Sequence, residues 1–361
     1  MRGAPRKKKN RGRASRIQIA AAATPDRAKK KRRGSRSRSS PAVRLIFLSS
    51  YCKTIGTSPI CIFNKNLSST MSAYQTIEKG SLHTLNYRVF FKNSDGKLIS
   101  PWHDIPLYAS ESNKLFNMVV EIPRWTNAKM EIATKEVMSP IRQDEKKGLP
   151  RFVNNIFPHR GYIWNYGALP QTWEDPGHKD ENTGENGDND PIDVIEIGSK
   201  VQKRGAVIRV KVLGVLALLD EGETDWKLVA IDENDELAPK LNGIEDVEKH
   251  LPGLLSATHE WFRIYKIPTG KPANKFAFNG QFKDRNFAHK IIEQTHQFWK
   301  KLVTSASPHP LNTECHKEEA VFKANLSDWE SFISKQPEFG HAQQVPEHVD
   351  KWHFISSEQN Q

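Results

Sequence analysis

Cysteine is scarce in this sequence, which contains three cysteines in 361 residues. Cys52, Cys61 and Cys315 form no CxxC pair and show no cysteine–histidine spacing typical of a zinc site. An odd and low number of cysteines argues against a disulfide framework and is typical of a reducing compartment. The chain is long enough to bury a substantial core, so we expect it to fold without covalent staples or a structural zinc.

Long apolar runs are also missing. The longest early run, residues 43–48, contains Arg44 and is far shorter than the roughly 18 residues that a membrane span requires. We therefore expect a soluble protein with no membrane partner. The length suits one large domain or two ordinary ones.

Acidic residues are nearly absent from the first seventy positions. One acid, Asp26, accompanies 19 lysines and arginines there, whereas residues 71–361 contain 35 basic and 41 acidic residues. The net charge of +12 therefore combines a basic tail with an acidic body. The tail has low apolar content, clustered like charges and no periodicity, which predicts disorder over residues 1–70.

The basic tail admits three functional interpretations. Its arginine- and serine-rich composition fits a mitochondrial transit peptide, and its basic clusters also fit nuclear import or contact with nucleic acid. Alternatively, Met71 is the true start and the preceding residues come from a mistaken gene model. The last interpretation predicts a cytoplasmic protein, whereas the first two predict the mitochondrial matrix or the nucleus.

Short strand-like segments dominate the chain after Tyr74. Alternating or apolar segments predict strands at residues 87–91, 118–123, 129–132, 207–213 and 227–231, with a hairpin turn at 93–97. Helical spacing appears at 244–250 and 286–302, and Ser327 is a candidate cap for a short third helix. Many short strands followed by a few late helices predict a closed or nearly closed β-barrel with helical additions.

Two acidic clusters carry the strongest chemical signal. Asp188, Asp190 and Asp193 fall within six residues, and a second cluster at residues 220–225 follows another apolar run. Carboxylates so close together repel one another unless cations lie between them. Oxygen ligands suit Mg²⁺ or Mn²⁺ better than zinc, so the clusters indicate a site for several hard metals that handles a phosphate substrate. Taken alone, one such cluster in a Gly/Asn-rich stretch is more typical of a turn.

Four motifs in order resemble the soluble family I inorganic pyrophosphatases in their eukaryotic form. They are Asp188-x-Asp190-Pro191-Ile192-Asp193 and the segments 121–131, 220–227 and 261–268, and the likeness extends from about residue 74 to residue 354. The resemblance implies a mainly β, α+β fold with an OB-like five-stranded barrel, in a single catalytic domain over residues 71–361. It also implies Mg²⁺-dependent hydrolysis of diphosphate to two phosphates.

The resemblance assigns metal ligands on the acidic side of the site. It places Asp188, Asp193 and Asp225 at a first metal, Asp193 also at a second, and Asp220 with Asp225 at a third that arrives with substrate. Asp190 is then the base that activates a metal-bridging hydroxide for attack, Glu131 acts on metals through water, and Glu121 belongs to the same cavity. Mg²⁺ is the expected cofactor, with Mn²⁺ or Zn²⁺ as substitutes and Ca²⁺ as an inhibitor.

The phosphate side is assigned to cations and hydroxyl donors. Arginine offers a planar fork to phosphate, lysine a compact charge, and tyrosine a donor without charge. With Asp190, the residues assigned to catalysis are Lys129, Arg151 and Tyr162. The substrate-binding set comprises Lys129, Arg151, Tyr162, Tyr166, Lys227, Tyr265 and Lys266.

Some positions bear on assembly or depart from the family pattern. Arg124, Trp125 and Trp352 match positions associated with the eukaryotic dimer interface, which predicts a homodimer, although Arg160 replaces a histidine found near that contact in some relatives. Pro150 directly precedes Arg151, and a proline there can change how the arginine enters the site.

Two other functional classes remain open from the residues alone. The body could serve as a chromatin-binding module whose basic tail contacts nucleic acid with a steep salt dependence. It could also be a metal-dependent phosphodiesterase or nuclease, which would need an open groove with aromatic stacking residues.

Overall fold

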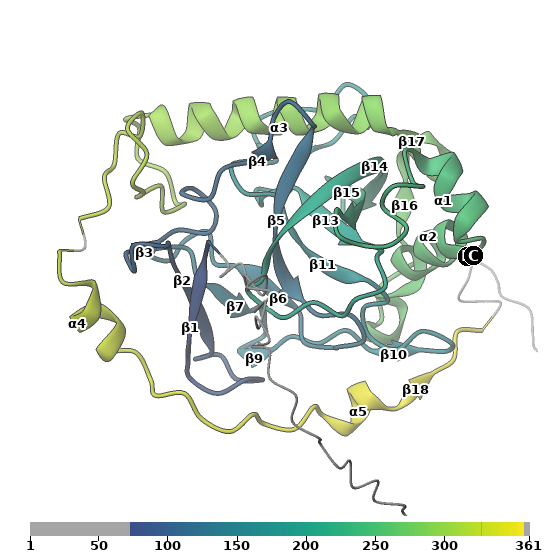
Figure 1. The fold of residues 1–361 in the computed structure, drawn as a ribbon. Helices are drawn as coiled ribbons and strands as arrows, with labels where there is room; N and C mark the ends of the chain where they lie inside the picture. Colours follow the sequence, from purple (N-terminus) through teal and green to yellow (C-terminus); the bar gives the residue numbers. More distant parts are fainter. Residues whose placement is uncertain (1–72, 326, 357–361) are drawn as a thin grey trace, which may run out of the picture. The chain divides into compact units, whose positions relative to one another are not determined.

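Five strands close into a ring that forms the centre of the fold (Figure 1). The structure is a computed structural model that describes residues 73–325 and 327–356. In the ring each strand pairs with the next, and the pairing of β14 with β15 closes it. This arrangement confirms the predicted mainly β fold with a five-stranded OB-like barrel. In order around the ring, the strands are β5 (Leu115–Ile122), β11 (Asn165–Ala168), β13 (Asp193–Glu196), β15 (Glu223–Asp232) and β14 (Val207–Asp220).

The longest hairpin of the barrel carries the second acidic cluster. Glu221 and Gly222 have φ angles of +54° and +95°, and they join β14 to β15 directly because Asp220 pairs with Glu223. Two central residues with positive φ are characteristic of tight hairpin turns that match strand twist. The turn therefore holds Asp220 at the end of one strand and Asp225 near the start of the next.

A smaller sheet packs beside the barrel and includes the predicted hairpin. The Asn93 amide donates to the Lys97 carbonyl at 3.0 Å, which confirms the turn over residues 93–97. Strand β6 (Met130–Ile132) lies at the end of this sheet and carries Glu131. The other strands are β1 (Gln75–Lys79), β2 (Arg88–Lys92), β3 (Leu98–Ile99) and β7 (Ile141–Gln143).

Three predicted helices are confirmed, and two helices, one of them a single turn at residues 347–350, were missed. Helices α1 (Ile244–His250) and α3 (Arg285–Thr304) occupy the expected segments, and Asp284 caps α3 by accepting from the Phe287 amide at 2.8 Å. Helix α2 (Leu254–Ile264) was not predicted. The cap of α4 (Trp329–Ser334) is Asp328, which accepts from the Ser331 amide, so the prediction of Ser327 as cap was wrong.

Short elements complete the described fold. They are β4 (Tyr108–Ser110), β8 (Glu145–Lys146), β9 (Leu149–Pro150), β10 (Asn155–Ile156), β12 (Asn186–Gly187), η1 (Ile267–Thr269), β16 (Lys275–Phe276), η2 (Ala277–Gly280), β17 (Lys283–Asp284), α5 (Glu347–Asp350) and β18 (Trp352–His353).

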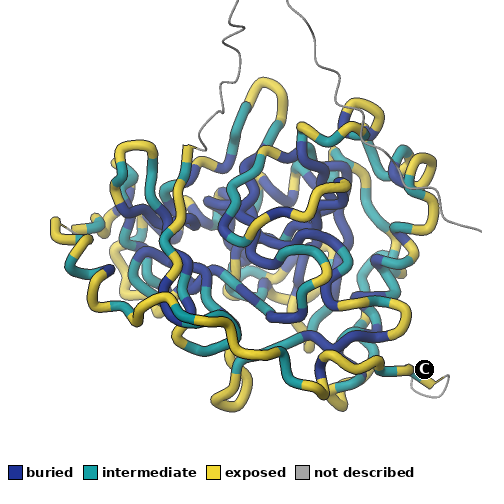
Figure 2. Tube along the Cα trace, turned by 60° about the horizontal axis from the view of Figure 1, so that its bottom comes forward, coloured by how far each residue is buried: buried dark blue, intermediate teal, exposed yellow. Residues whose placement is uncertain are grey.

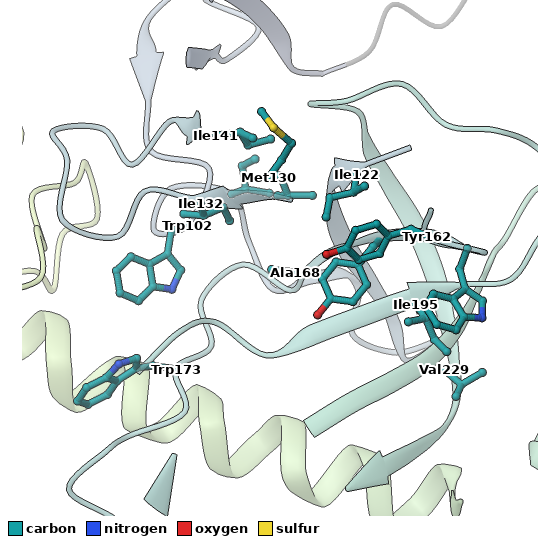
Figure 3. Close-up of a cluster of buried hydrophobic side chains, with 14 of the residues drawn as sticks. Trp102, Ile122, Met130, Ile132, Ile141, Tyr162, Ala168, Trp173, Ile195 and Val229 are labelled. Carbon is teal, nitrogen blue, oxygen red and sulfur yellow. The ribbon is translucent and has the colours of Figure 1, made fainter. Parts of the chain in front are cut away.

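The largest apolar cluster joins the barrel to the smaller sheet. It combines Met130, Ile132 and Ile141 of the sheet with Ile122 and Ile195 of the barrel (Figure 3). Buried positions concentrate in the centre of the described fold, and exposed positions lie in the surrounding loops (Figure 2). Because this core is continuous, side chains from both sheets are held in a fixed relation where the two meet.

Several sequence predictions fall outside the described residues. The basic tail, Cys52 and Cys61 belong to residues 1–72, so the three interpretations of the tail stay predictions. The described residues belong to one unit, Leu67–Gln361. Among them, no helix is both long and apolar enough to cross a bilayer.

Candidate active site

A cavity of about 430 Å³ opens at the place where the barrel meets the smaller sheet. All fourteen residues that the sequence assigned to metal, catalysis or substrate contribute to its wall. They come from both sheets and from the end of α2, so only the folded chain brings them together. The assigned residues on the wall are Glu121, Lys129, Glu131, Arg151, Tyr162, Tyr166, Asp188, Asp190, Asp193, Asp220, Asp225, Lys227, Tyr265 and Lys266.

The first acidic cluster reaches this cavity through a turn. Taken alone, such a cluster is more typical of a turn, and the backbone from Asp188 to Asp190 does form one. Asn189 has a φ of +75°, and the Asp190 amide donates to Asp188 Oδ1 at 3.0 Å. The turn is held from outside, because Trp173 Nε1 donates to Asn189 Oδ1 at 3.1 Å. Both aspartates nevertheless line the cavity.

Glu174 does not line the cavity itself, but it meets two acids of the acidic wall, and the sequence analysis did not identify it. Carboxylate oxygens of Glu174, Asp188 and Asp225 all lie within 4.8 Å of one another. Glu174 Oε1 accepts from the Trp226 amide at 3.0 Å, whereas its buried Oε2 has no hydrogen-bond partner among the described residues. Glu174 follows no acidic cluster and is far from Asp225 in the chain, so no spacing rule could have found it.

Burial and mutual repulsion disfavour the charged form of these carboxylates. Burial raises the pKa of Asp188 well above its usual range, and the neighbouring Asp225 raises it further. Burial also raises the pKa of Asp225 to about 7. Asp190 opens onto the cavity, yet the surrounding protein withdraws it from bulk water and raises its pKa to about 7, with Glu131 adding to the shift. A divalent cation would offset this repulsion.

The donor set fits a hard divalent cation. Glu174, Asp188 and Asp225 offer carboxylate oxygens alone, which is the ligand chemistry of Mg²⁺, Mn²⁺ and Ca²⁺. The unpartnered Glu174 Oε2 is an acceptor for which the described protein supplies no donor. Glu121 is less free, since its Oε1 accepts from the Ile132 amide at 2.8 Å and so ties β5 to β6.

The cationic wall is organised by Asp144, another residue that the sequence analysis missed. Lys129 Nζ lies 3.2 Å from Asp144 Oδ2, and Arg151 Nη1 donates to the same oxygen at 2.8 Å. Lys129 Nζ also donates to Glu131 Oε2 at 2.8 Å. Burial alone would lower the pKa of Lys129, but Glu131 and Asp144 raise it well above its ordinary value. Lys129 therefore remains a cation at neutral pH.

Pro150 does not prevent Arg151 from reaching the site. Pro150 lies in β9 opposite Glu145, and the following Arg151 amide donates to the Asp144 carbonyl at 2.7 Å. The Arg151 carbonyl accepts from the Lys129 amide at 3.1 Å, so the backbone of Arg151 is anchored on both sides. Its guanidinium then contributes to the cavity wall.

Two further lysines of the site form ion pairs with acids of the acidic wall. Lys227 Nζ contacts both Asp193 and Asp225, and it donates to the Tyr166 hydroxyl at 2.9 Å. Lys266 Nζ contacts Asp220 at the turn of the β14–β15 hairpin and donates to Glu221 Oε1 at 3.3 Å. Each lysine thus joins the acidic wall to the phosphate-binding wall that was predicted.

The tyrosines present hydroxyl donors from an aromatic base. Tyr166 donates to Asp193 Oδ2 at 2.6 Å, and Tyr265 donates to Asp220 Oδ2 at 3.3 Å. The Tyr265 ring stacks on Trp261 of α2, with centroids 4.9 Å apart. Burial raises the pKa of Tyr162 to about 12, so this hydroxyl stays protonated at neutral pH. The missed helix α2 therefore has a direct role in building the site.

Comparisons with known proteins agree with this geometry. A family model described as inorganic pyrophosphatase matches residues 118–300. Inorganic pyrophosphatase 1 of Caenorhabditis elegans is 62% identical over 284 residues, which are 79% of this chain and 66% of that protein. The inorganic pyrophosphatase of Bos taurus is 54% identical over 287 residues, covering 78% of this chain and 98% of that protein.

Solved structures show the same likeness. The inorganic pyrophosphatase from Schistosoma japonicum superposes with a TM-score of 0.74 at 46% identity, covering 78% of this chain and 100% of that one. An N-terminally truncated vacuolar soluble pyrophosphatase of Trypanosoma cruzi, in complex with PPi, gives a TM-score of 0.59 at 45% identity. That match covers 70% of this chain and 98% of the Trypanosoma chain.

The acidic wall generates a prediction about stability. With divalent cations removed by a chelator, the free energy of unfolding should fall as the pH rises from about 4 to about 7. Asp190 and Asp225 have ordinary pKa values of 3.8 and folded values of about 7, so the folded state binds more protons in this interval. Urea denaturation across the interval measures the effect.

The control for that experiment is the Asp190→Asn, Asp225→Asn double variant. It lacks both titrating groups, and its stability should therefore depend less on pH between the same limits. A wild-type stability that rises steadily across the interval would contradict the assignment of raised pKa values.

Proposed function

The chain belongs to the inorganic pyrophosphatase family and hydrolyses diphosphate, and from this premise we propose that Mg²⁺ is its cofactor and Asp190 its catalytic base. The single observation that carries the proposal is the convergence of all fourteen assigned residues on one cavity with an acidic and a cationic wall. The acidic wall suits the cofactor, and the cationic wall suits the oxygens of a small, highly charged anion. The proposed catalytic domain spans residues 71–361.

Asp188, Asp193, Asp220 and Asp225 are the proposed metal ligands, with Glu131 and Glu121 completing the acidic wall. Glu174 extends this set, because its carboxylate lies with those of Asp188 and Asp225 and one of its oxygens has no hydrogen-bond partner among the described residues. When bound, the cations neutralise the substrate and lower the pKa of coordinated water. Mn²⁺ and Zn²⁺ are the proposed substitutes.

The remaining steps belong to the chain's own residues. Asp190 accepts the proton of the attacking water, a task suited to a carboxylate whose pKa is raised to about 7. Lys129, Arg151 and Lys266 bind phosphate oxygens, together with Lys227. The hydroxyl of Tyr162 donates to the same oxygens without adding charge. Those of Tyr166 and Tyr265 donate to Asp193 and Asp220 in this structure, so they must leave these acids to reach the substrate. The protein thereby supplies positioning and electrostatic stabilisation, as phosphoryl transfer requires.

The site geometry favours diphosphate over a nucleic acid strand. A nuclease or single-strand binder would offer exposed aromatic faces along an open groove. Here Tyr265 stacks on Trp261, and Tyr162 packs against Tyr166 and Trp261 with centroids 5.2 and 5.1 Å apart. The rings pack against one another within the protein, so they offer no row of exposed faces on which bases could stack. The Trypanosoma cruzi relative was solved in complex with PPi, which agrees with this choice.

An exposed aromatic surface supports assembly into a homodimer. The side chains of Trp125, Phe157, Trp352 and Phe354 are 56%, 57%, 46% and 72% exposed. Phe157 contacts Trp352 and Phe354, with ring centroids 5.7 and 5.5 Å apart. Exposed apolar patches of this kind mark interaction sites, and the resemblance of Arg124, Trp125 and Trp352 to dimer positions makes a second copy the proposed partner.

The proposed compartment depends on whether residues 1–70 belong to the protein. Cytoplasmic localisation follows if translation starts at Met71, and the matrix or nucleus if residues 1–70 are part of the protein. Contact of the tail with nucleic acid stays a prediction from its charge.

Replacing the proposed base provides the test of the mechanism. Asp190→Asn should lower kcat for diphosphate by roughly 10²- to 10⁴-fold, the usual contribution of a general base. The amide keeps the size of the side chain, so the melting temperature should change little. Phosphate release in Mg²⁺ measures the rate, and Asp95→Asn in the exposed hairpin is the matched control. Normal turnover in Asp190→Asn would reject the assigned role.

The choice of cation is tested by competition. Ca²⁺ added to the Mg²⁺-loaded enzyme should inhibit diphosphate hydrolysis, because its longer and looser coordination misplaces the attacking water. Mn²⁺ in place of Mg²⁺ should support hydrolysis, and a chelator should abolish it. Activation by Ca²⁺ alone would contradict the proposed site.

The homodimer is tested at its aromatic surface. Trp352→Glu should shift the protein from dimer to monomer in sedimentation equilibrium, because a charge would be buried without a partner. Phe339→Glu is the matched control, since Phe339 is also exposed, at 59%, but has no assigned place in the interface. A wild-type monomer, or equal effects of both substitutions, would count against this interface.

A further inference from the structure

A row of charged side chains crosses the smaller sheet and ends at the cavity. Arg88 of β2 pairs directly with Arg142 of β7, and Arg142 pairs directly with Glu131 of β6. Directly opposed residues in antiparallel strands project to the same face with Cβ atoms roughly 5 Å apart. The row therefore connects the outer part of the sheet to an acid of the active site.

Glu136 stabilises the outer end of this row. Two arginines placed directly opposite each other repel. Arg88 donates from Nε and Nη2 to the two Glu136 oxygens at 2.7 and 2.8 Å, and Arg142 Nη1 lies 3.9 Å from Glu136 Oε1. One carboxylate thus compensates both arginines and fixes the position of Arg142.

Glu131 is held at the inner end between two cations. Its Oε2 accepts from Lys129 Nζ at 2.8 Å, and its Oε1 accepts from Arg142 Nη2 at 3.3 Å. Each carboxylate oxygen therefore has a separate basic partner. Lys129 already shares Asp144 with Arg151, so it is surrounded by acids that compete with a phosphate oxygen for its charge.

We propose that Arg142 is a positioning residue for diphosphate hydrolysis, which fixes Glu131 and leaves Lys129 available to the phosphate. The inference rests on the proposed function, because it requires Glu131 and Lys129 to act at the cation and phosphate sites. Lys129 is already the nearer partner of Glu131, at 2.8 Å against 3.3 Å for Arg142, and Arg142 offsets part of the charge by which Glu131 holds it. Without Arg142, Glu131 would hold Lys129 more strongly, and substrate would bind more weakly.

The fork of the arginine side chain suits this role. Arg142 directs Nη2 to Glu131 and Nη1 to Glu136, so each acid faces a different nitrogen of the guanidinium. A lysine has a single charged nitrogen and would not reach both acids in one conformation. Arg142→Lys should therefore restore part of the function that Arg142→Gln loses.

Arg142 contributes little to the stability of the fold, so a change in KM on its substitution would not result from unfolding. Its side chain is 32% exposed and lines a second cavity of about 270 Å³, together with Glu131, Glu136 and Asp190. Removing its charge creates no closed void and breaks only half-exposed ion pairs, which contribute little to stability. The melting temperature of Arg142→Gln should consequently stay close to that of the wild type.

The first experiment compares Arg142→Gln with a matched control. Arg142→Gln should raise KM for diphosphate about three- to fivefold, the range that loss of a half-exposed ion pair supports, with a smaller change in kcat. Arg209 of β14 does not line the cavity, and its Nε lies 2.7 Å from Glu233 Oε1. Arg209→Gln breaks this ion pair and should leave KM unchanged. Arg142→Lys should give an intermediate KM.

The second experiment asks whether Arg142 acts through Glu131. In a Glu131→Gln background the effect of Arg142→Gln on KM should disappear, because residues that act through one contact are not additive. Calorimetric titration with inorganic phosphate in Mg²⁺ supplies a readout independent of turnover. Phosphate affinity should fall in Arg142→Gln and should not fall in Arg209→Gln.

The outcomes separate this inference from the proposed function. If Arg142→Gln and Arg209→Gln have the same KM and phosphate affinity while the wild type hydrolyses diphosphate, the inference is overturned and the function stands. An equal rise in KM with and without Glu131 would also overturn it, because Arg142 would then act independently of Glu131. If the wild type itself does not hydrolyse diphosphate in Mg²⁺, the proposed function fails first.

Discussion

Repulsion among carboxylates at one end of the barrel is the constraint on which the rest of this structure depends. Glu174, Asp188 and Asp225 bring oxygens within 4.8 Å of one another. Burial and this repulsion together raise the pKa of Asp188 and Asp225 above the usual range of a carboxyl group. Lys227 offsets part of this repulsion by contacting Asp193 and Asp225. The carboxylate oxygens without a basic partner suit divalent cations. A diphosphatase needs this balance, because its substrate brings further negative charge into the same space.

The fold maintains that balance by placing opposite charges on different elements. The acids belong mainly to the barrel, in the turn before β13 and at the ends of β14 and β15, whereas Lys129 precedes β6 of the smaller sheet and Arg151 follows β9. The shared apolar core, with Met130 and Ile122, holds the two sheets together. Asp144 and Glu131 connect the two charge types at their boundary. Small shifts between the sheets would thus alter acids and cations together.

Sequence reasoning was most successful where the chemistry lies in contiguous motifs. Lys129, Asp190 and the other residues could be assigned to one site because their motifs are long enough to identify a family. The structure places all of them on the lining of one cavity. Sequence reasoning was less successful where tertiary structure decides. The positive φ of Asn189 is not specified by the motif itself, and Glu174 meets its partners only through folding. Helix α2 begins after Gly253, without a side-chain cap hydrogen bond, so it lacked a clear start signal.

Locating the cations in the folded protein tests the central claim most directly. Crystals grown with Mn²⁺ should give anomalous density in the cavity, with the nearest ligands drawn from Glu174, Asp188 and Asp225. Such a result would show that bound cations lie among the repelling carboxylates. Mn²⁺ bound only to surface acids, in crystals of protein that hydrolyses diphosphate with Mn²⁺, would contradict the account.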